Sequence, residues 1–91
     1  MHAARWVLMY ISNWAHLGRL MPQLGIQFVN GHFATIKDNK PIKDNKNGAS
    51  ENMTGGYYVF TYSDSAQTDI VEIRSLEQQI QWLRDDFSRC L

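Results

Sequence analysis

The chain has 91 residues, of which 44% are hydrophobic and 20% charged, and its nine basic residues are balanced by nine acidic ones. This composition is typical of a single globular domain spanning residues 1–91 and excludes a largely disordered chain. No apolar run reaches the ~20 residues of a membrane helix, and Trp6–Ile11 is too short for a signal peptide. We therefore expect a cytoplasmic protein without membrane contact, and the neutral charge argues against a dedicated nucleic-acid binder.

The first predicted element is a helix within residues 3–21. On a helical wheel its large apolar residues fall in one arc with polar residues opposite, as in a helix that lies on a core. These residues are Trp6, Tyr10, Trp14, Leu17 and Met21. Because Pro22 stops a helix, we expect the end between Leu17 and Met21. The run Trp6–Ile11 alone would also fit a buried strand, and the fit over the whole segment favours the helix.

A β-hairpin is predicted next, from Gly25–Val29 and His32–Ile36. The intervening Asn30-Gly31 tolerates the positive φ angles of a type I′ turn. This turn places Phe28 opposite Phe33 on one face.

A second hairpin is predicted from Tyr57–Ser63 and Thr68–Arg74, because the first segment is almost wholly β-branched and aromatic. Tyr58, Phe60 and Tyr62 share one face of this strand. We expect that face to pack under the helices, although an open aromatic face would also suit the stacking of nucleic-acid bases.

The last predicted helix begins after Ser75, whose hydroxyl can cap it, and runs to about residue 89. Its apolar stripe is expected to face the core and consists of Leu76, Ile80, Leu83, Phe87 and Leu91.

Trp82 lies away from that stripe and shares a second helix face with Gln79, Asp86 and Cys90. Because tryptophan is enriched at protein interfaces, these four residues are a candidate interface. The alternative is that Trp82 lies across the sheet edge or against the long loop.

The predicted fold is therefore α+β with the order αββββα. Two hairpins would form a four-stranded antiparallel sheet, and the N- and C-terminal helices would pack on one of its faces. Residues 37–56 would form a long connection, part of which we expect to be mobile.

This connection contains the sequence Lys-Asp-Asn-Lys twice, with lysines at Lys37, Lys40, Lys43 and Lys46. The repeat lacks the alternating oxygen ligands of a calcium loop, so we predict no metal site there. The lysines could bind a phosphate backbone together with Tyr57 or Tyr58. Asp38 and Asp44 offset half of their charge, which favours an ordinary solvated loop.

No catalytic residue, metal site or cofactor is predicted. The histidines His2, His16 and His32 are scattered, and no serine has the surroundings of an activated nucleophile. A third hypothesis, a small-ligand binder or enzyme, would place a pocket between sheet and helices near Tyr10, Trp14 and His16.

The leading hypothesis is a non-enzymatic protein-interaction module that forms a homodimer or higher oligomer and binds another protein. Because the chain is short and has no recognisable motif, we expect a small accessory protein, such as those of mobile elements or phages. The single cysteine, Cys90, fits a reducing compartment. A nucleic-acid-binding protein and a pocket-bearing protein remain the alternatives.

Overall fold

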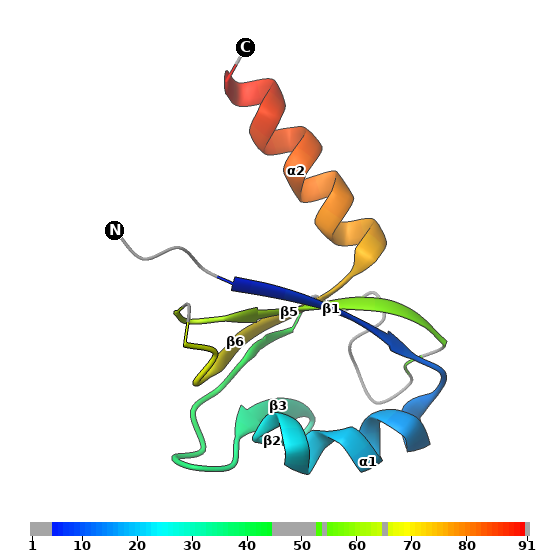
Figure 1. Ribbon diagram of the computed structural model, residues 1–91, viewed down its shortest axis with the longest axis vertical. Helices are drawn as coiled ribbons and strands as arrows, with labels where there is room; N and C mark the ends of the chain where they lie inside the picture. The colour runs from blue at the N-terminus through cyan, green and yellow to red at the C-terminus, as the bar shows by residue number, and fades with distance from the viewer. Residues whose placement is uncertain (1–4, 45–52, 54, 65, 91) are drawn as a thin grey trace.

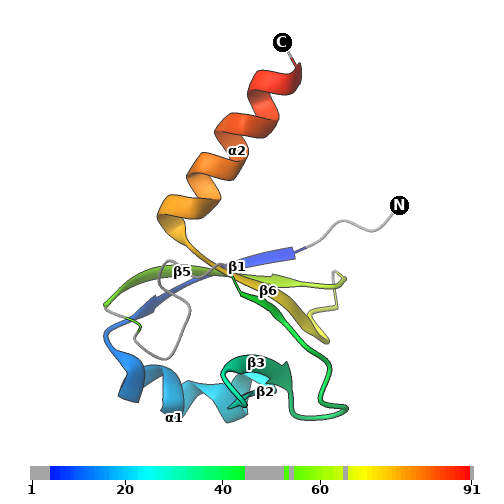
Figure 2. The same ribbon diagram turned by 180° about the vertical axis from the view of Figure 1, so that it is seen from behind.

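The computed structural model describes residues 5–44, 53, 55–64 and 66–90, which form an α+β fold (Figure 1). The elements are β1 (Arg5–Ile11), α1 (Trp14–Leu24), β2 (Ile26–Val29), β3 (His32–Thr35), β4 (Lys43–Asp44), β5 (Gly56–Tyr62), β6 (Ile70–Ser75) and α2 (Leu76–Cys90). Figures 1 and 2 show that α1 and the β2–β3 hairpin lie on one side of the larger sheet, whereas α2 stands on the other side.

The larger sheet has the strand order β1-β5-β6-β4. Strand β5 pairs antiparallel with both β1 and β6, while the short β4 pairs parallel with β6. The β2–β3 hairpin forms a separate two-stranded sheet. The α+β class is thus confirmed, but the prediction of a single antiparallel sheet made from two hairpins was wrong, because β1 takes the place beside β5.

The predicted N-terminal helix over residues 3–21 was also wrong, because Arg5–Ile11 is a strand and the helix begins only at Trp14. The large aromatic residues Trp6, Tyr10 and Trp14 are four residues apart. This spacing brings side chains to one face of a helix and equally to one face of a strand, so it does not distinguish the two.

Helix α1 has distinct caps at both ends. The Asn13 side chain accepts a hydrogen bond from the His16 N–H at 2.9 Å, as a helix N-cap does. Gly25 ends the helix in the left-handed conformation with φ 71°. Pro22 lies inside the last turn, so the predicted end between Leu17 and Met21 came too early.

Both predicted hairpins are present. In the first, Asn30 and Gly31 have φ angles of 51° and 81°, and Phe28 pairs with Phe33 at a ring separation of 4.9 Å. In the second, β5 pairs with β6, and the register shifts between Thr61 and Tyr62. Local turn and strand signals were sufficient to predict both.

The hydrophobic core lies between the inner face of the larger sheet and the layer of α1 with the β2–β3 hairpin. Its buried residues are Ile11, Leu17, Ile26, Phe33, Ile42, Met53, Tyr58, Phe60, Ile70 and Ile73. Tyr58 and Phe60 point into this core, as predicted. They are covered by α1 and the hairpin rather than by two helices.

Helix α2 does not lie on the same face as α1, which corrects the predicted packing. Strand β6 ends at Ser75 and α2 begins at the next residue, so no connecting residue turns the chain back toward the inner face. The Ser75 hydroxyl accepts a hydrogen bond from the Gln78 N–H at 3.2 Å, which confirms the predicted helix start. Neither described helix has the length and apolarity needed to cross a membrane.

The first part of the 37–56 connection follows the protein surface closely. The Thr35 N–H donates to the Lys40 carbonyl at 2.9 Å, and Pro41 bridges to Ala34. The chain then forms β4 against β6. Residues 45–52 and 54 lie outside the described residues, so the prediction that part of the 37–56 connection is mobile is not tested there.

Candidate functional site: an exposed apolar surface

Alternate residues of β1 and β5 point away from the core. Because directly paired residues share one face of a sheet, the register of β1 on β5 identifies them. They are Trp6, Leu8 and Tyr10 of β1, paired in that order with Thr61, Val59 and Tyr57 of β5. This outward face is apolar over nearly its whole length.

Large apolar side chains are exposed mainly on this side of the molecule. Nine of them are exposed among the described residues, and eight lie on the outward face of β1 and β5 or on α2. We call these eight the outer surface: Trp6, Leu8, Tyr10, Tyr57, Ile80, Trp82, Leu83 and Phe87, with exposed fractions of 40% to 65%. The ninth, Ile36, directly follows β3.

The beginning of α2 covers part of the outward face. Val59 and Arg74 point to the α2 side of the sheet and are buried, as is Gln79, the fourth residue of the helix. Trp82 meets Trp6 edge-to-face at a ring separation of 6.1 Å. The rest of α2 extends beyond the sheet (Figures 1 and 2), which leaves the outward face of β1 open.

A polar cluster around Arg74 fixes α2 to the sheet. The Arg74 Nε donates to Glu72 Oε2 at 2.8 Å, and its Nη1 donates to Gln79 Oε1 at 3.3 Å. Its guanidinium also lies 4.8 Å from the centre of the Trp82 ring, close enough for a cation–π contact. A cavity of about 250 Å³ adjoins the cluster and is lined by Trp6, Thr61, Glu72, Arg74, Gln79 and Trp82.

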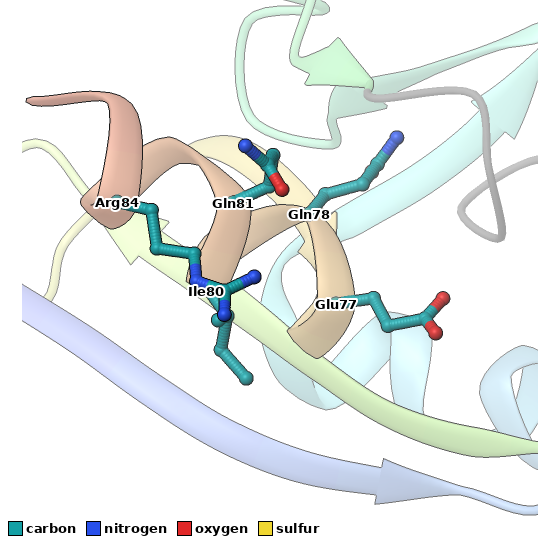
Figure 3. Close-up of a pocket in the computed structure, with 5 residues that line it drawn as sticks. All are labelled: Glu77, Gln78, Ile80, Gln81 and Arg84. Carbon is teal, nitrogen blue, oxygen red and sulfur yellow. The ribbon is translucent and has the colours of Figure 1, made fainter.

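A second hollow, of about 380 Å³, lies on α2 itself (Figure 3). It is lined by Glu77, Gln78, Ile80, Gln81 and Arg84. Figure 3 shows Ile80 on the opposite side of the helix from Gln78 and Gln81, so these side chains do not converge on a common point.

The four residues of the predicted interface on α2 fall into two pairs. Gln79 and Trp82 contact the sheet through Arg74 and Trp6, as described above. Asp86 and Cys90 are exposed on the part of α2 that projects beyond the sheet, and Cys90 is a free thiol. The exposed stripe of Ile80, Leu83 and Phe87 was expected to lie in the core and was therefore missed as a candidate surface.

Strand β1 was missed for a related reason. The alternation of Trp6, Leu8 and Tyr10 is the signal that could have identified its apolar outward face. Because the wheel pattern predicts a helix over these residues, the sequence does not place their side chains together with Trp82.

The lysines of the predicted nucleic-acid site are separated. Lys37 Nζ lies 3.2 Å from Asp69, and Lys43 Nζ lies 3.9 Å from Glu72. Lys40 is exposed, and Lys46 lies outside the described residues. Of the two tyrosines proposed to assist them, Tyr57 is exposed beside Tyr10 and Tyr58 is buried.

Asp38, beside Lys37, has a local structural role. The Thr35 hydroxyl donates to Asp38 Oδ1 at 2.6 Å. This hydrogen bond is the main reason that the pKa of Asp38 is lowered, and the charge of Lys37 adds to the effect.

The residues of the predicted ligand pocket lie apart. Tyr10 is on the outward face of the sheet, whereas Trp14 packs on Phe28 within the layer beneath it. His16 Nδ1 accepts a hydrogen bond from the Ser12 N–H at 3.0 Å at the start of α1. Within the described part of the chain, no group of three His, Cys, Asp or Glu residues could hold a metal ion.

No protein-family model, curated protein or solved structure matches this chain. We therefore base the function on the geometry of the outer surface.

Proposed function

We propose that the protein is a non-enzymatic interaction module that assembles with copies of itself through the outer surface. The observation that supports this is the segregation of exposed apolar side chains, since eight of the nine exposed large ones among the described residues lie there. Single exposed apolar residues are ordinary on protein surfaces, whereas the gathering of large apolar side chains on one side of a molecule is typical of an interaction site.

The size of the outer surface fits a protein interface. Five of its eight residues are aromatic and each is about half exposed, which leaves on the order of 500 Å² of aromatic surface open to water. Leu8, Ile80 and Leu83 add further apolar area. The total approaches the ~800 Å² per partner of a stable interface.

The other two hypotheses have weaker support. Lys37 and Lys43 are already engaged with carboxylates, so the loop offers less free positive charge to a phosphate backbone than the sequence suggested. The proposed pocket residues Tyr10 and Trp14 lie on opposite sides of the sheet. Neither hypothesis explains why the eight apolar residues of the outer surface are exposed together.

The proposal is tested by adding charge to the outer surface. Phe87 is the most exposed residue of the group, and it lies on the projecting part of α2, so Phe87→Glu should leave the fold intact. Ile36→Glu is the matched control, because Ile36 is half exposed but lies away from the outer surface. The molar mass of each protein is measured by light scattering after size exclusion.

We expect the wild type and Ile36→Glu to have a mass well above the 10.6 kDa of one chain. Phe87→Glu should shift toward 10.6 kDa. A wild type that stays at the mass of one chain when concentrated would contradict the proposal. So would equal masses for Phe87→Glu and Ile36→Glu.

A further inference from the structure

Strand β1 lies at an edge of the larger sheet. It pairs with β5 along one side, and no other strand in the described part of the chain pairs with its second side. Natural edge strands are usually short, or protected by lysine, proline or an inward-pointing charge. Strand β1 has seven residues, contains no lysine or proline, and carries its one charge at its first residue, Arg5. This edge is therefore suited to pairing with another strand.

The sequence of β1 is nearly symmetric about Leu8. An aliphatic or thioether side chain lies on each side of Leu8, at Val7 and Met9, and an aromatic one lies next beyond, at Trp6 and Tyr10. In an antiparallel pair of two β1 strands centred on Leu8, Trp6 lies opposite Tyr10 and Val7 opposite Met9. Leu8 lies opposite its own copy, and Arg5 is opposite Ile11, so no like charges meet.

We propose that β1 pairs antiparallel with β1 of a second copy, in the register centred on Leu8, and joins the two larger sheets into one. This rests on the proposed function only in taking the partner to be another copy. The contact is the free edge of β1, the strand that carries Trp6, Leu8 and Tyr10 of the outer surface, so the outer surfaces of the two copies lie side by side rather than one covering the other. A twofold axis relates the two copies, so the same residues contribute from each side.

The register centred on Leu8 follows from the alternation of side chains along β1 and from the length of the strand. A shift of one residue would place the apolar outward face of one copy beside the inward face of the other, because side chains alternate. Shifting the centre to Val7 or Met9 leaves part of β1 unpaired and places Trp6 or Tyr10 opposite Leu8. Only the Leu8 register pairs all seven residues and matches aromatic with aromatic.

The pairing also extends the outer surface. Directly opposed residues share a face, so the outward Trp6, Leu8 and Tyr10 of both copies form one continuous aromatic area. Both α2 helices then stand on the same side of the joined sheet. The stripe of Ile80, Leu83 and Phe87 lies on this side in each copy.

Cysteine cross-linking tests the register. In a Cys90→Ser background, Leu8→Cys places two thiols on residues with Cα atoms about 5 Å apart, within the range of a disulfide. Tyr10→Cys places its two copies four residues apart along the joined strands, about 13 Å, which is too far. Ile36→Cys is the control: Ile36 is exposed and lies away from β1, so this variant measures the rate of disulfide formation by random collision.

We expect Leu8→Cys to form a covalent dimer under mild oxidation at least about tenfold faster than Tyr10→Cys or Ile36→Cys. A mixture of Trp6→Cys and Tyr10→Cys should cross-link more than either protein alone. If the wild type is oligomeric but Leu8→Cys links no faster than the controls, the β1 pairing is wrong and the proposed function stands. Equally slow linkage of Leu8→Cys and the controls is also expected if the free edge of β1 binds a strand of another protein. A wild type that is monomeric throughout overturns both proposals.

A charge exchange gives an independent readout. Leu8→Glu and Leu8→Lys each place like charges opposite each other, and each should raise the dimer dissociation constant at least about a hundredfold. Mixing the two proteins should restore a dimer that contains one copy of each. If the mixture stays monomeric although the wild type dimerises, Leu8 does not face its own copy.

Discussion

The two faces of the larger sheet have similar composition but different surroundings. On β5, Tyr58 and Phe60 point inward and are buried under α1 and the β2–β3 hairpin. Val59 and Thr61 point outward and are buried as well, but only because α2 begins there. Toward β1 the outward face is open. An apolar strand face thus does not reveal whether its cover comes from the same chain or from another one.

The largest expected effect is a difference in stability between substitutions on the inward and the outward face. Phe60→Ala removes a ring that is fully buried in the core, and it should lower the free energy of unfolding by about 3–5 kcal/mol. Leu8→Ala, on the open outward face, should change it by less than ~1 kcal/mol in dilute protein. Urea unfolding measures both. Equal losses would mean that the two faces are covered equally well within one chain.

Substitutions in the part of the outward face that α2 covers should have an effect of intermediate size on the free energy of unfolding. Arg74→Ala removes the ion pair with Glu72 and the contact with Trp82, and it should cost about 2–3 kcal/mol of unfolding free energy. Arg84→Ala is the control, because Arg84 is exposed on α2. A loss at Arg74 no greater than that at Arg84 would show that α2 is not held to the sheet by this cluster.

The boundary between β1 and α1 can be tested at Asn13. Asn13→Ala removes the acceptor for the His16 N–H and should cost ~1 kcal/mol, measured by thermal unfolding. Asn13→Ser, which can also cap, should remain close to the wild type. If the two variants behave alike, the helix does not begin at this residue.

The smallest expected effect concerns Asp38. Because the pKa of Asp38 is lowered in the folded protein, its contribution to stability is present above the ordinary carboxyl pKa and is lost as the pH falls through the lowered value. Thr35→Val should return the Asp38 pKa toward its ordinary value in an NMR titration, whereas Thr35→Ser should preserve the lowered value. An unchanged titration in Thr35→Val would assign the shift to the neighbouring lysines instead.

Elements with strong local signals were predictable from the sequence. Asn30-Gly31 determines the first hairpin through its turn, and Ser75 marks the start of α2 through its cap. The rich aromatic content of β5 identified it as a strand. In each case the deciding interaction lies within a few residues of the chain.

The elements that were predicted wrongly depend on contacts between residues that are far apart in the sequence. The four-residue spacing of Trp6, Tyr10 and Trp14 fits a strand as well as a helix, and pairing with β5 decides the matter. The position of α2 depends on which face of the sheet is already filled. The sequence marks the Trp82 face as unusual but not its partner Trp6, because the wheel pattern predicts a helix where β1 lies.

The most direct test of the account is NMR-detected amide hydrogen exchange along β1 in the wild-type protein. A strand at the edge of a sheet bonds to its one neighbour through alternate residues, whereas a strand with neighbours on both sides has all its amides engaged. We predict slow exchange at consecutive amides from Val7 to Met9, because a second copy of β1 pairs with the open side. Slow exchange at alternate amides only, in concentrated protein, would contradict the account.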